Sequence, residues 1–402
     1  MQVLGWMIFG ISFLGLAHSY LLYPFFLWLK VRKRTINSLV FSPDDDDLPF
    51  VSIVSSLYNE EAVIAQKIHT LFQLQYPSSK LQVLLGSDCS ADQTNSIVAN
   101  LVGNRPHFHF FPFSERRGKP PVINDLVAKA SAMVPDGQEH ILIITDANVM
   151  LEPSTLFQLI KHFKHPKIML VDAHMSHVGM QESGISKAED QYISTEVRLK
   201  HWESLNGGRM VGPFGGCYAI RATHFSPVPE NWLVDDFYIA MKAFEQGGWA
   251  INELAAICYE GVSHDIKEEY RRKRRISAGN FQNMRTFRHL WWPPLQALSY
   301  AFFSHKVLRW LGPFFIFGII LGAGILALLG NLIFTVLFPI MIVGILLVIA
   351  LDQVFAYFSI HIKILRGLRY FLYMNAALLE GFFKYLKGIK TNVWQPPKRS
   401  NS

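Results

Sequence analysis

The chain has 402 residues, 50% of them hydrophobic, and a formal net charge of +7, so it can bury a large core. The positive charge gathers beside the apolar segments and in residues 271–288, and no nucleic-acid-binding motif is visible, which favours anionic headgroups or phosphates and excludes a nucleic-acid partner. Cys89, Cys217 and Cys258 are odd in number and widely spaced, which excludes a disulfide scaffold or a cysteine metal site.

Residues 3–29 contain no charged side chain, and a stretch of this length can cross a bilayer once as a helix. The stretch lacks the basic start and the small-residue cleavage site of a signal peptide. It is followed by a basic cluster: Lys30, Arg32, Lys33 and Arg34. Because positive residues favour the cytoplasmic side, we expect a transmembrane helix in residues 1–34, a polar linker in residues 35–49 and a cytoplasmic domain after them.

Short apolar runs alternate with helical stretches in the domain that we expect over residues 50–265. The expected strands lie at residues 50–55, 81–86, 107–111 and 141–145, and the expected helices at residues 61–74, at residues 91–101 and after Pro120-Pro121. Such alternation predicts an α/β domain with a mostly parallel sheet and helices on both faces. A glycine-rich stretch, a strand, a helix and a short strand are expected at residues 207–216, 217–220, 235–246 and 249–252.

Polar turns follow the first two expected strands. Asn59 and Glu60 come after the first strand, and Asp88 comes at the end of the second. Both turns should lie at the same edge of a parallel sheet. The Asp88 carboxylate could accept a hydrogen bond from the imide N–H of a nucleotide base, whereas Asp92 and Thr94 are expected to cap the next helix.

Asp146-Ala147-Asn148 directly follows the buried strand expected at residues 141–145. Open α/β sheets bind their ligands at this end of a strand. One carboxylate and one amide, two positions apart, can offer two oxygens to a hard cation that holds a diphosphate. The structural alternative is that Asp146 caps a turn and Asn148 is a turn residue.

The C-terminal third mixes basic and apolar segments. Residues 266–305 predict basic amphipathic or interfacial helices, and residues 306–352 predict two transmembrane helices that turn at Gly330-Asn331. Residues 353–402 predict an interfacial or re-entrant helix and a basic cytosolic tail. The apolar stretch 365–386 carries four charges, which disfavours a fourth span without excluding it.

Several motifs, in this order, resemble the family 2 glycosyltransferases, which have the nucleotide-sugar-binding GT-A fold. The resemblance covers residues 50–289 and rests on the Asn-Glu turn after the first strand, on residues 87–94 with Asp88, on residues 117–124 with Lys119, on Asp146-Ala147-Asn148 and on Asp235-Asp236. It implies that Asn59, Glu60, Asp88, Lys119 and Asp146 bind the donor nucleotide, and that Asp146 and Asn148 hold Mg²⁺ or Mn²⁺.

The resemblance also implies that Asp236, together with Asp235, serves catalysis, with Asp236 as the base that deprotonates the acceptor hydroxyl. One direct displacement then inverts the anomeric configuration. Two structural alternatives stay open: Asp235 caps the helix that it begins, and Lys119 is a surface lysine.

Residues 271–282 resemble the Gln-x-x-Arg-Trp helix of membrane-embedded polysaccharide synthases. In this register Arg272 replaces the glutamine, Arg275 matches the arginine, and Ile276 replaces the tryptophan. The resemblance implies that Arg272 and Arg275 clamp the leaving diphosphate. Residues 215–221 resemble the strand that lines the acceptor side in the family 2 glycosyltransferases, which implies that Gly215 and Gly216 lie beside the acceptor. We expect Trp202 to line the acceptor cleft as well.

The sequence therefore predicts a multi-pass protein of the bacterial inner (plasma) membrane with a cytoplasmic catalytic domain. The expected function is a metal-dependent, inverting hexosyltransferase that moves a sugar from a nucleotide sugar, UDP-linked, to a lipid-linked or growing glycan acceptor in envelope or exopolysaccharide synthesis. Membrane lipids and partner subunits of such a pathway are the expected partners. The alternatives are a processive polysaccharide synthase with a channel and a catalytically silent assembly subunit of the same fold.

Overall fold

The computed structural model describes residues 1–393, apart from residues 37–38, 104, 179–185, 262–265, 359 and 361. The chain divides into two compact units. The helical unit comprises residues 1–30, 180–195 and 263–388, and the sheet unit comprises residues 31–179, 196–262 and 389–402. The end of the basic tail, residues 394–402, lies outside the described residues.

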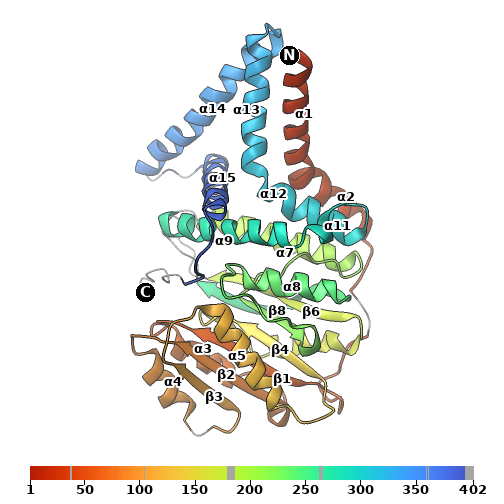
Figure 1. Ribbon diagram of the computed structural model, residues 1–402, viewed down its shortest axis with the longest axis vertical. Helices are drawn as coiled ribbons and strands as arrows, with labels where there is room; N and C mark the ends of the chain where they lie inside the picture. Colours follow the sequence, from red (N-terminus) through yellow and green to blue (C-terminus); the bar gives the residue numbers. More distant parts are fainter. Residues whose placement is uncertain are drawn as a thin grey trace. The chain divides into compact units, whose positions relative to one another are not determined.

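The sheet unit is built on one eight-stranded sheet with the strand order β3-β2-β1-β4-β7-β6-β8-β5 (Figure 1). The strands are β1 Phe50–Leu57, β2 Leu81–Asp88, β3 Phe108–Phe113, β4 His140–Thr145, β5 Val149–Leu151, β6 Ile168–Val178, β7 Cys217–Arg221 and β8 Trp249–Gly261. The four strands from β3 to β4 are parallel, as predicted.

The other half of the sheet differs from the predicted mostly parallel arrangement. β7 runs antiparallel to both β4 and β6, and β5 runs antiparallel to β8, whereas β6 and β8 are parallel. β5 and β6 were not expected, and β8 extends well beyond the short strand predicted at residues 249–252. β5 has only three residues, too few for a periodic pattern to be visible.

Helices cover both faces of the sheet. They are α3 Ile64–Phe72, α4 Thr94–Val102, α5 Lys119–Ala132, α6 Thr155–Ile160 and α8 Asp235–Glu245, with short 3-10 turns at Ser78–Lys80, Lys161–Lys164 and Ala222–His224. A further helix, α7 Ser186–Leu205, belongs to the helical unit up to residue 195 and to the sheet unit from residue 196. One continuous core joins the apolar faces of α3, α4 and α6 to the sheet, including Ile53, Ile68 and Leu85. α5 packs on the opposite face so closely that a methyl group on Gly86 of β2 would lie 2.9 Å from the Val122 side chain.

The helical unit contains α1 Gln2–Ala17, α2 Tyr23–Val31, α9 Ile266–Thr286, α10 Arg288–Trp291, α11 Ala297–Phe302, α12 Leu308–Trp310, α13 Gly312–Leu328, α14 Leu332–Tyr357 and α15 Lys363–Leu386, with π-helical turns at His18–Leu22 and Phe303–Val307. α1 packs on α13 through small residues. Gly318 of α13 lies over Ser12 of α1. Gly5 of α1 lies against Leu326 of α13, and a methyl group added to Gly5 would be 3.0 Å from the Leu326 side chain. Such contacts let two helices approach closely without relying on a hydrophobic driving force, as membrane helices must.

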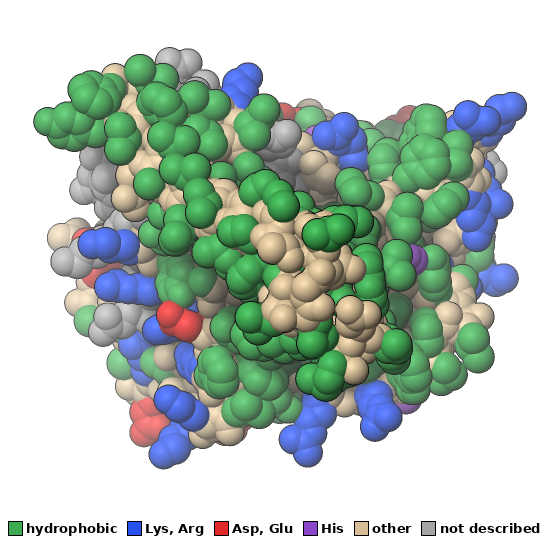
Figure 2. All heavy atoms as spheres, turned by 90° about the horizontal axis from the view of Figure 1, so that it is seen from above, with side chains coloured by type: hydrophobic (Ala, Val, Ile, Leu, Met, Phe, Trp, Pro, Cys, Tyr) green, Lys and Arg blue, Asp and Glu red, His purple; other side chains and the backbone are tan. Residues whose placement is uncertain are grey.

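Within the described residues, two helical segments are long and apolar enough to cross a membrane, Gln2–Val31 and Leu332–Phe355. A third is available if the pair Ala297–Trp310 and Gly312–Leu328, which is bent by 65°, counts as one span. Large exposed hydrophobic side chains on α1, α13 and α14 agree with contact to lipid, and Figure 2 shows hydrophobic side chains gathered over the face seen from above. Helix α15 is not apolar enough to be among these candidate spans.

Candidate active site

The turns after β1 and β2 lie side by side, as predicted, because Leu57 of β1 pairs with Ser87 of β2. Side chains join the two turns. Asn59, at a φ of 52°, accepts a hydrogen bond from the backbone N–H of Ala91 at 2.9 Å. The backbone N–H of Glu60 donates to Oγ1 of Thr94 at 2.8 Å. Asn59 and Thr94 thus give the sheet edge a fixed shape.

Asp92 behaves as predicted, since its Oδ1 accepts the N–H of Thr94 at the start of α4 at 3.0 Å. Thr94 does not cap α4 with its side chain, because the hydroxyl is engaged by Glu60 in the neighbouring turn. The expectation that Thr94 caps the helix is therefore wrong. The hydroxyl accepts from Glu60 because the turns after β1 and β2 lie side by side at one edge of the sheet.

Asp88, at the end of β2, holds the turn that leads into α5. The carboxylate is 2% exposed and accepts the backbone N–H groups of Arg117 and Gly118, each at 2.8 Å. Gly118 has a φ of +87°, and a methyl group there would overlap the side-chain amide of Asn392. Asp88 therefore positions Lys119, the first residue of α5. Each oxygen of the Asp88 carboxylate can still accept a second hydrogen bond, which leaves room for the predicted contact with a nucleotide base. That contact stays a prediction.

Lys119 lies between two carboxylates. Its ammonium is 2.7 Å from Oδ1 of Asp146 and 3.3 Å from Oδ2 of Asp235. Removal from water lowers the pKa of Lys119, but Asp146, Asp235 and Asp236 together raise it more, so the pKa ends above its ordinary value. Lys119 is consequently a permanent positive charge at the end of β4, and not an unattached surface lysine.

Asp235 and Asp236 form the first turn of α8. Loss of water around Asp236, and then the charge of Asp235, raise the Asp236 pKa to about 7, although Lys119 opposes the change. Gly215, at a φ of +90°, passes so close that a methyl group there would overlap the Asp236 carboxylate. We expected Gly215 to let a ligand approach the backbone closely. In this structure the absence of its side chain leaves space for the Asp236 carboxylate, whose pKa is about 7.

The turn Asp146-Ala147-Asn148 is fixed from two sides. The carbonyl oxygen of Gly216 accepts the backbone N–H of Asp146 at 2.9 Å and the hydroxyl of Thr145 at 3.0 Å. On the other side lies Lys67 of α3, which is fully buried and donates to Oγ1 of Thr145 at 2.9 Å and to the carbonyl oxygen of Val149 at 2.5 Å. Lys67 thus joins the residue before the turn to the residue after it.

Lys67 was not among the predicted site residues, although the sequence contains a signal for it. Ile64, Ile68 and Leu71 form the apolar stripe of α3, and a lysine at position 67 falls on the same stripe. Burial lowers the pKa of Lys67 to about 8, which indicates the cost of holding this charge away from water.

Asn148 has a neighbour that the sequence did not predict. Its amide donates to Oε1 of Glu260 at 2.9 Å, and Glu260 reaches this place because it pairs with Val149 across β8 and β5. Asn148 and Glu260 are 112 residues apart, so the sequence pattern gave no indication of this contact. Within the described residues no group of three or more His, Cys, Asp and Glu side chains could by itself hold a metal ion.

The oxygens of Asp146 and Asn148, with Glu260 beside them, still fit a hard divalent cation. Mg²⁺ and similar ions are commonly held by one or two carboxylates, with substrate phosphates and water completing the coordination. All three side chains offer oxygen and none offers sulfur or nitrogen as a ligand, so the donor set suits Mg²⁺ or Mn²⁺. The predicted metal residues are therefore compatible with the ion.

The end of α7 shapes the glycine-rich loop. Lys200 and Asp172 form a buried ion pair at 2.8 Å, and Asp172 also accepts the backbone N–H of Phe214 at 3.0 Å. Glu203 accepts the backbone N–H of Val211 at 3.0 Å. Trp202 lies between these two anchoring residues on α7, and its predicted place beside the acceptor stays a prediction.

The predicted clamp residues Arg272 and Arg275 lie on α9, in the helical unit. The guanidinium of Arg272 is 3.7 Å from the Glu269 carboxylate, one helical turn away. Their contact with a diphosphate remains a prediction.

Two family profiles match the chain: glycosyl transferase family 21 over residues 16–200, and glycosyl transferase family group 2 over residues 140–351. The second match covers more than half of the 402 residues. The chain belongs to glycosyl transferase family group 2. The resemblance drawn from the turn motifs is thereby confirmed.

Relatives within this family are distant. The chain is 26% identical over 240 residues to a beta-monoglucosyldiacylglycerol synthase of Trichormus variabilis, covering 58% of this chain and 49% of the relative. It is 24% identical over 188 residues to a poly-beta-1,6-N-acetyl-D-glucosamine synthase of Staphylococcus epidermidis, covering 46% and 42%. The family group 2 protein thus spans about half the length of these curated relatives or less.

Among solved structures, the chain resembles a mannosyltransferase from Pyrobaculum calidifontis in complex with GDP-Man and Mn²⁺. The TM-score is 0.69 at 20% identity, and the match covers 94% of this chain and 99% of the other. At this identity the likeness shows the fold alone. The predicted GT-A fold is confirmed, and this family group 2 chain combines it with helices long and apolar enough to span a membrane.

Proposed function

We propose that the protein is a membrane-bound, inverting glycosyltransferase that transfers a sugar from a nucleotide donor, UDP-linked, to a lipid-linked or growing glycan acceptor in cell-envelope or exopolysaccharide synthesis. The observation that carries the proposal is the cluster of Lys119, Asp146, Asp235 and Asp236. These residues come from three separate segments of the sequence, and their ion pairs and close charges join them at the end of β4.

Asp236 is the proposed base. With a pKa raised to about 7, by loss of water and by Asp235, the carboxylate exists in both protonation states near neutral pH and is a stronger base than an ordinary aspartate. The acceptor hydroxyl gives its proton to Asp236 while its oxygen bonds to the anomeric carbon. The bond from that carbon to the diphosphate oxygen breaks, and the electron pair leaves with the nucleoside diphosphate. Attack opposite the leaving group inverts the configuration.

The departing diphosphate needs positive charge that is already in place. Lys119 supplies a permanent one, since its pKa lies above the ordinary value. Asp146 and Asn148 would hold a divalent cation, which supplies further neutralisation of the leaving group when bound. Lys67 and Gly216 keep that turn in position by the hydrogen bonds on either side of it.

The nucleotide is proposed to lie over the joined turns after β1 and β2. Asn59, Glu60 and Asp88 border this edge, and Asp88 fixes the Arg117-Gly118 backbone that leads to Lys119. This arrangement links recognition of the base to placement of the phosphate-binding lysine. Arg272 and Arg275 are the proposed additional clamp on the leaving group, and Gly215, Gly216 and Trp202 the proposed acceptor side.

The names of the two relatives support acceptors of the proposed classes. One is named a synthase of a glucosylated diacylglycerol, and the other a synthase of a polysaccharide. A multi-pass position in the inner membrane, with the sheet unit in the cytoplasm and partner subunits of an envelope pathway, completes the proposal. The two or three candidate spans support it.

A transfer assay tests the proposal. Purified full-length protein would receive a panel of labelled nucleotide sugars, total membrane lipids and Mn²⁺ or Mg²⁺, with a parallel arm that contains a chelator. We expect one donor to give a lipid-soluble product with inverted anomeric configuration, lost in the chelator arm. A product with retained configuration would overturn the inverting mechanism. Neither transfer nor hydrolysis of any nucleotide sugar would overturn the enzymatic proposal and favour a silent assembly subunit. A long polymer would identify a processive synthase.

A further inference from the structure

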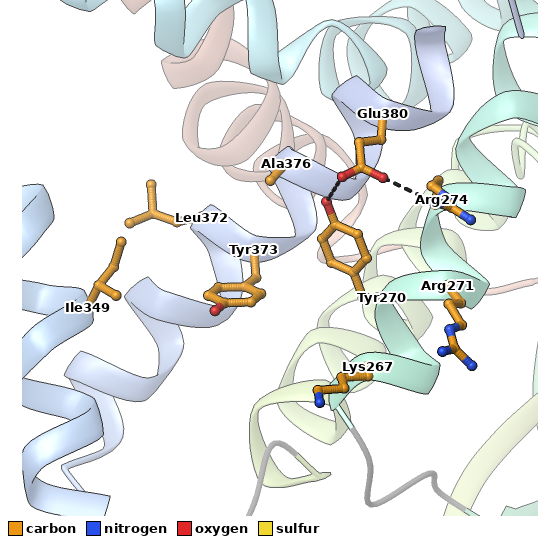
Figure 3. A pocket seen from close by; sticks show the side chains of 9 residues that line it. All are labelled: Lys267, Tyr270, Arg271, Arg274, Ile349, Leu372, Tyr373, Ala376 and Glu380. Atoms are coloured by element: carbon orange, nitrogen blue, oxygen red, sulfur yellow. Dashed lines mark hydrogen bonds and ion pairs between the residues drawn. The ribbon is translucent and has the colours of Figure 1, made fainter. Parts of the chain in front are cut away.

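The helical unit contains a pocket of about 590 Å³ between α9, α14 and α15 (Figure 3). One part of its wall is apolar and consists of Ile349, Leu372 and Ala376. The other part carries polar groups, and α9 provides its cations: Lys267, Arg271 and Arg274. Figure 3 shows Ile349 and Leu372 facing one another at one end, away from the cationic side chains of α9. The pocket is thus amphipathic along its length.

Charge in the pocket is unbalanced. Among the described residues that line it, Glu380 is the one acidic side chain. Its carboxylate accepts hydrogen bonds from the Tyr270 hydroxyl at 2.7 Å and from Arg274 at 3.2 Å. The described lining residues thus carry three cations and one carboxylate. A ligand with a compact negative group and an apolar tail complements these two halves.

The surroundings indicate where such a ligand comes from. α14, which supplies Ile349, contains the candidate membrane span Leu332–Phe355, and its neighbours Leu346 and Leu347 are 62% and 49% exposed. α9 is the strongly basic helix of the chain. A basic helix beside an apolar span is the arrangement that attracts anionic headgroups at a membrane surface. A component of the membrane would therefore fit both halves of the pocket.

We propose that this pocket binds an anionic phospholipid, with the headgroup phosphate at Lys267 and Arg271 and an acyl chain along Ile349 and Leu372. The bound lipid joins α9 to α14 and α15 and so stabilises the helical unit. None of the residues that line the pocket is among the proposed donor, metal, catalytic or acceptor residues, so the proposal does not depend on the donor or acceptor of the enzyme.

The test uses purified full-length protein in neutral detergent and measures thermal unfolding while phosphatidylglycerol, phosphatidylcholine or inorganic phosphate is added. A ligand that binds the folded state raises the unfolding temperature by mass action. We expect phosphatidylglycerol to stabilise the protein at concentrations at which phosphatidylcholine and phosphate do not. Equal stabilisation by phosphatidylcholine would overturn the anionic assignment, and equal stabilisation by inorganic phosphate would overturn the lipid assignment.

Variants locate the effect. Lys267→Gln with Arg271→Gln removes two exposed cations, and we expect the apparent affinity for phosphatidylglycerol to fall by about tenfold or more, the value of a charge-assisted hydrogen bond. Arg285→Gln is the control, because it removes a charge from the same helix outside the pocket. Leu372→Trp fills the apolar end without changing charge and should also weaken binding. Unchanged affinity in both pocket variants, or an equal loss in the control, would show general attraction to a basic surface and contradict the proposal.

Discussion

At the scale of single residues, the site depends on how closely charged groups approach one another. Asp236 lies beside Asp235 and Lys119, and Gly215 leaves room for its carboxylate. The result is one acid with a pKa near 7 and one lysine whose pKa is raised above its ordinary value. Residue types identified Asp236 and Lys119 as candidates, but the raised pKa follows from three-dimensional proximity.

The first prediction concerns pH. Asp236 must be deprotonated to accept the acceptor's proton, so we expect kcat to rise through a pKa of about 7, by about tenfold between pH 6 and pH 8. The folded-state pKa is raised above the ordinary value of an aspartate, so the contribution of Asp236 to stability is present at low pH and is lost as the pH rises through about 7. Initial rates and unfolding free energies in overlapping buffers measure both trends. A rate independent of pH from 6 to 8 would refute the assignment.

The second prediction concerns Gly215→Ala. The added methyl group would overlap the Asp236 carboxylate, so we expect kcat to fall by about 100-fold while donor affinity changes little, because displacing a catalytic group by about 1 Å is costly. Gly247→Ala is a matched control: Gly247 has a φ of +86°, close to the +90° of Gly215, and nothing within 4 Å of its added methyl group. Equal losses in the two variants would attribute the effect to backbone strain and not to Asp236.

At the scale of elements, the β4 turn is held by a helix on one face of the sheet and by a glycine-rich loop. Its motif was visible because Asp146 and Asn148 follow a short apolar run, and the paired turns after β1 and β2 were found in the same way. Glu260 was missed because only the pairing of β8 with β5 brings it to Asn148. Lys67 was missed because its burial depends on how α3 packs, although it interrupts an apolar stripe.

The third prediction tests the role of α3. Lys67→Met removes the ammonium that joins Thr145 to Val149, so the Asp146-Ala147-Asn148 turn should loosen. Groups that orient metal ligands typically contribute 10- to 100-fold to metal affinity, so we expect the Mn²⁺ concentration for half-maximal rate to rise by about tenfold. Lys129→Met on α5 is the control because Lys129 is exposed. An unchanged Mn²⁺ requirement in a folded Lys67→Met protein would contradict the positioning role.

At the scale of the whole molecule, the chain leaves the sheet unit after residue 262 and returns to it at residue 389. Asn392 then lies against Gly118 and donates to the carbonyl oxygen of Glu230. The apolar composition indicated the spans and the motif order indicated the GT-A domain. This return contact carried no signal in the sequence, because a single asparagine in a basic tail resembles any surface residue.

The fourth prediction concerns this return. Asn392→Ala removes a hydrogen bond and a contact against the Arg117-Gly118 turn, so amide exchange at residues 117–119 should accelerate and donor affinity should fall by several-fold, the effect of about 1 kcal/mol. Thr391→Ala, at the exposed neighbouring position, should change neither quantity. Exchange at residues 117–119 that is the same in both variants and in the wild type would exclude a role for the tail in the site.

The most direct test of the proposed role of Asp236 is the transfer rate of Asp236→Asn, measured beside donor binding and compared with Asp136→Asn, which alters an exposed aspartate. We expect Asp236→Asn to lower kcat by about 100-fold or more, the usual contribution of a general base, while nucleotide-sugar binding and the unfolding temperature are retained. Asp136→Asn should match the wild type. Wild-type transfer by Asp236→Asn would contradict the proposal that Asp236 deprotonates the acceptor.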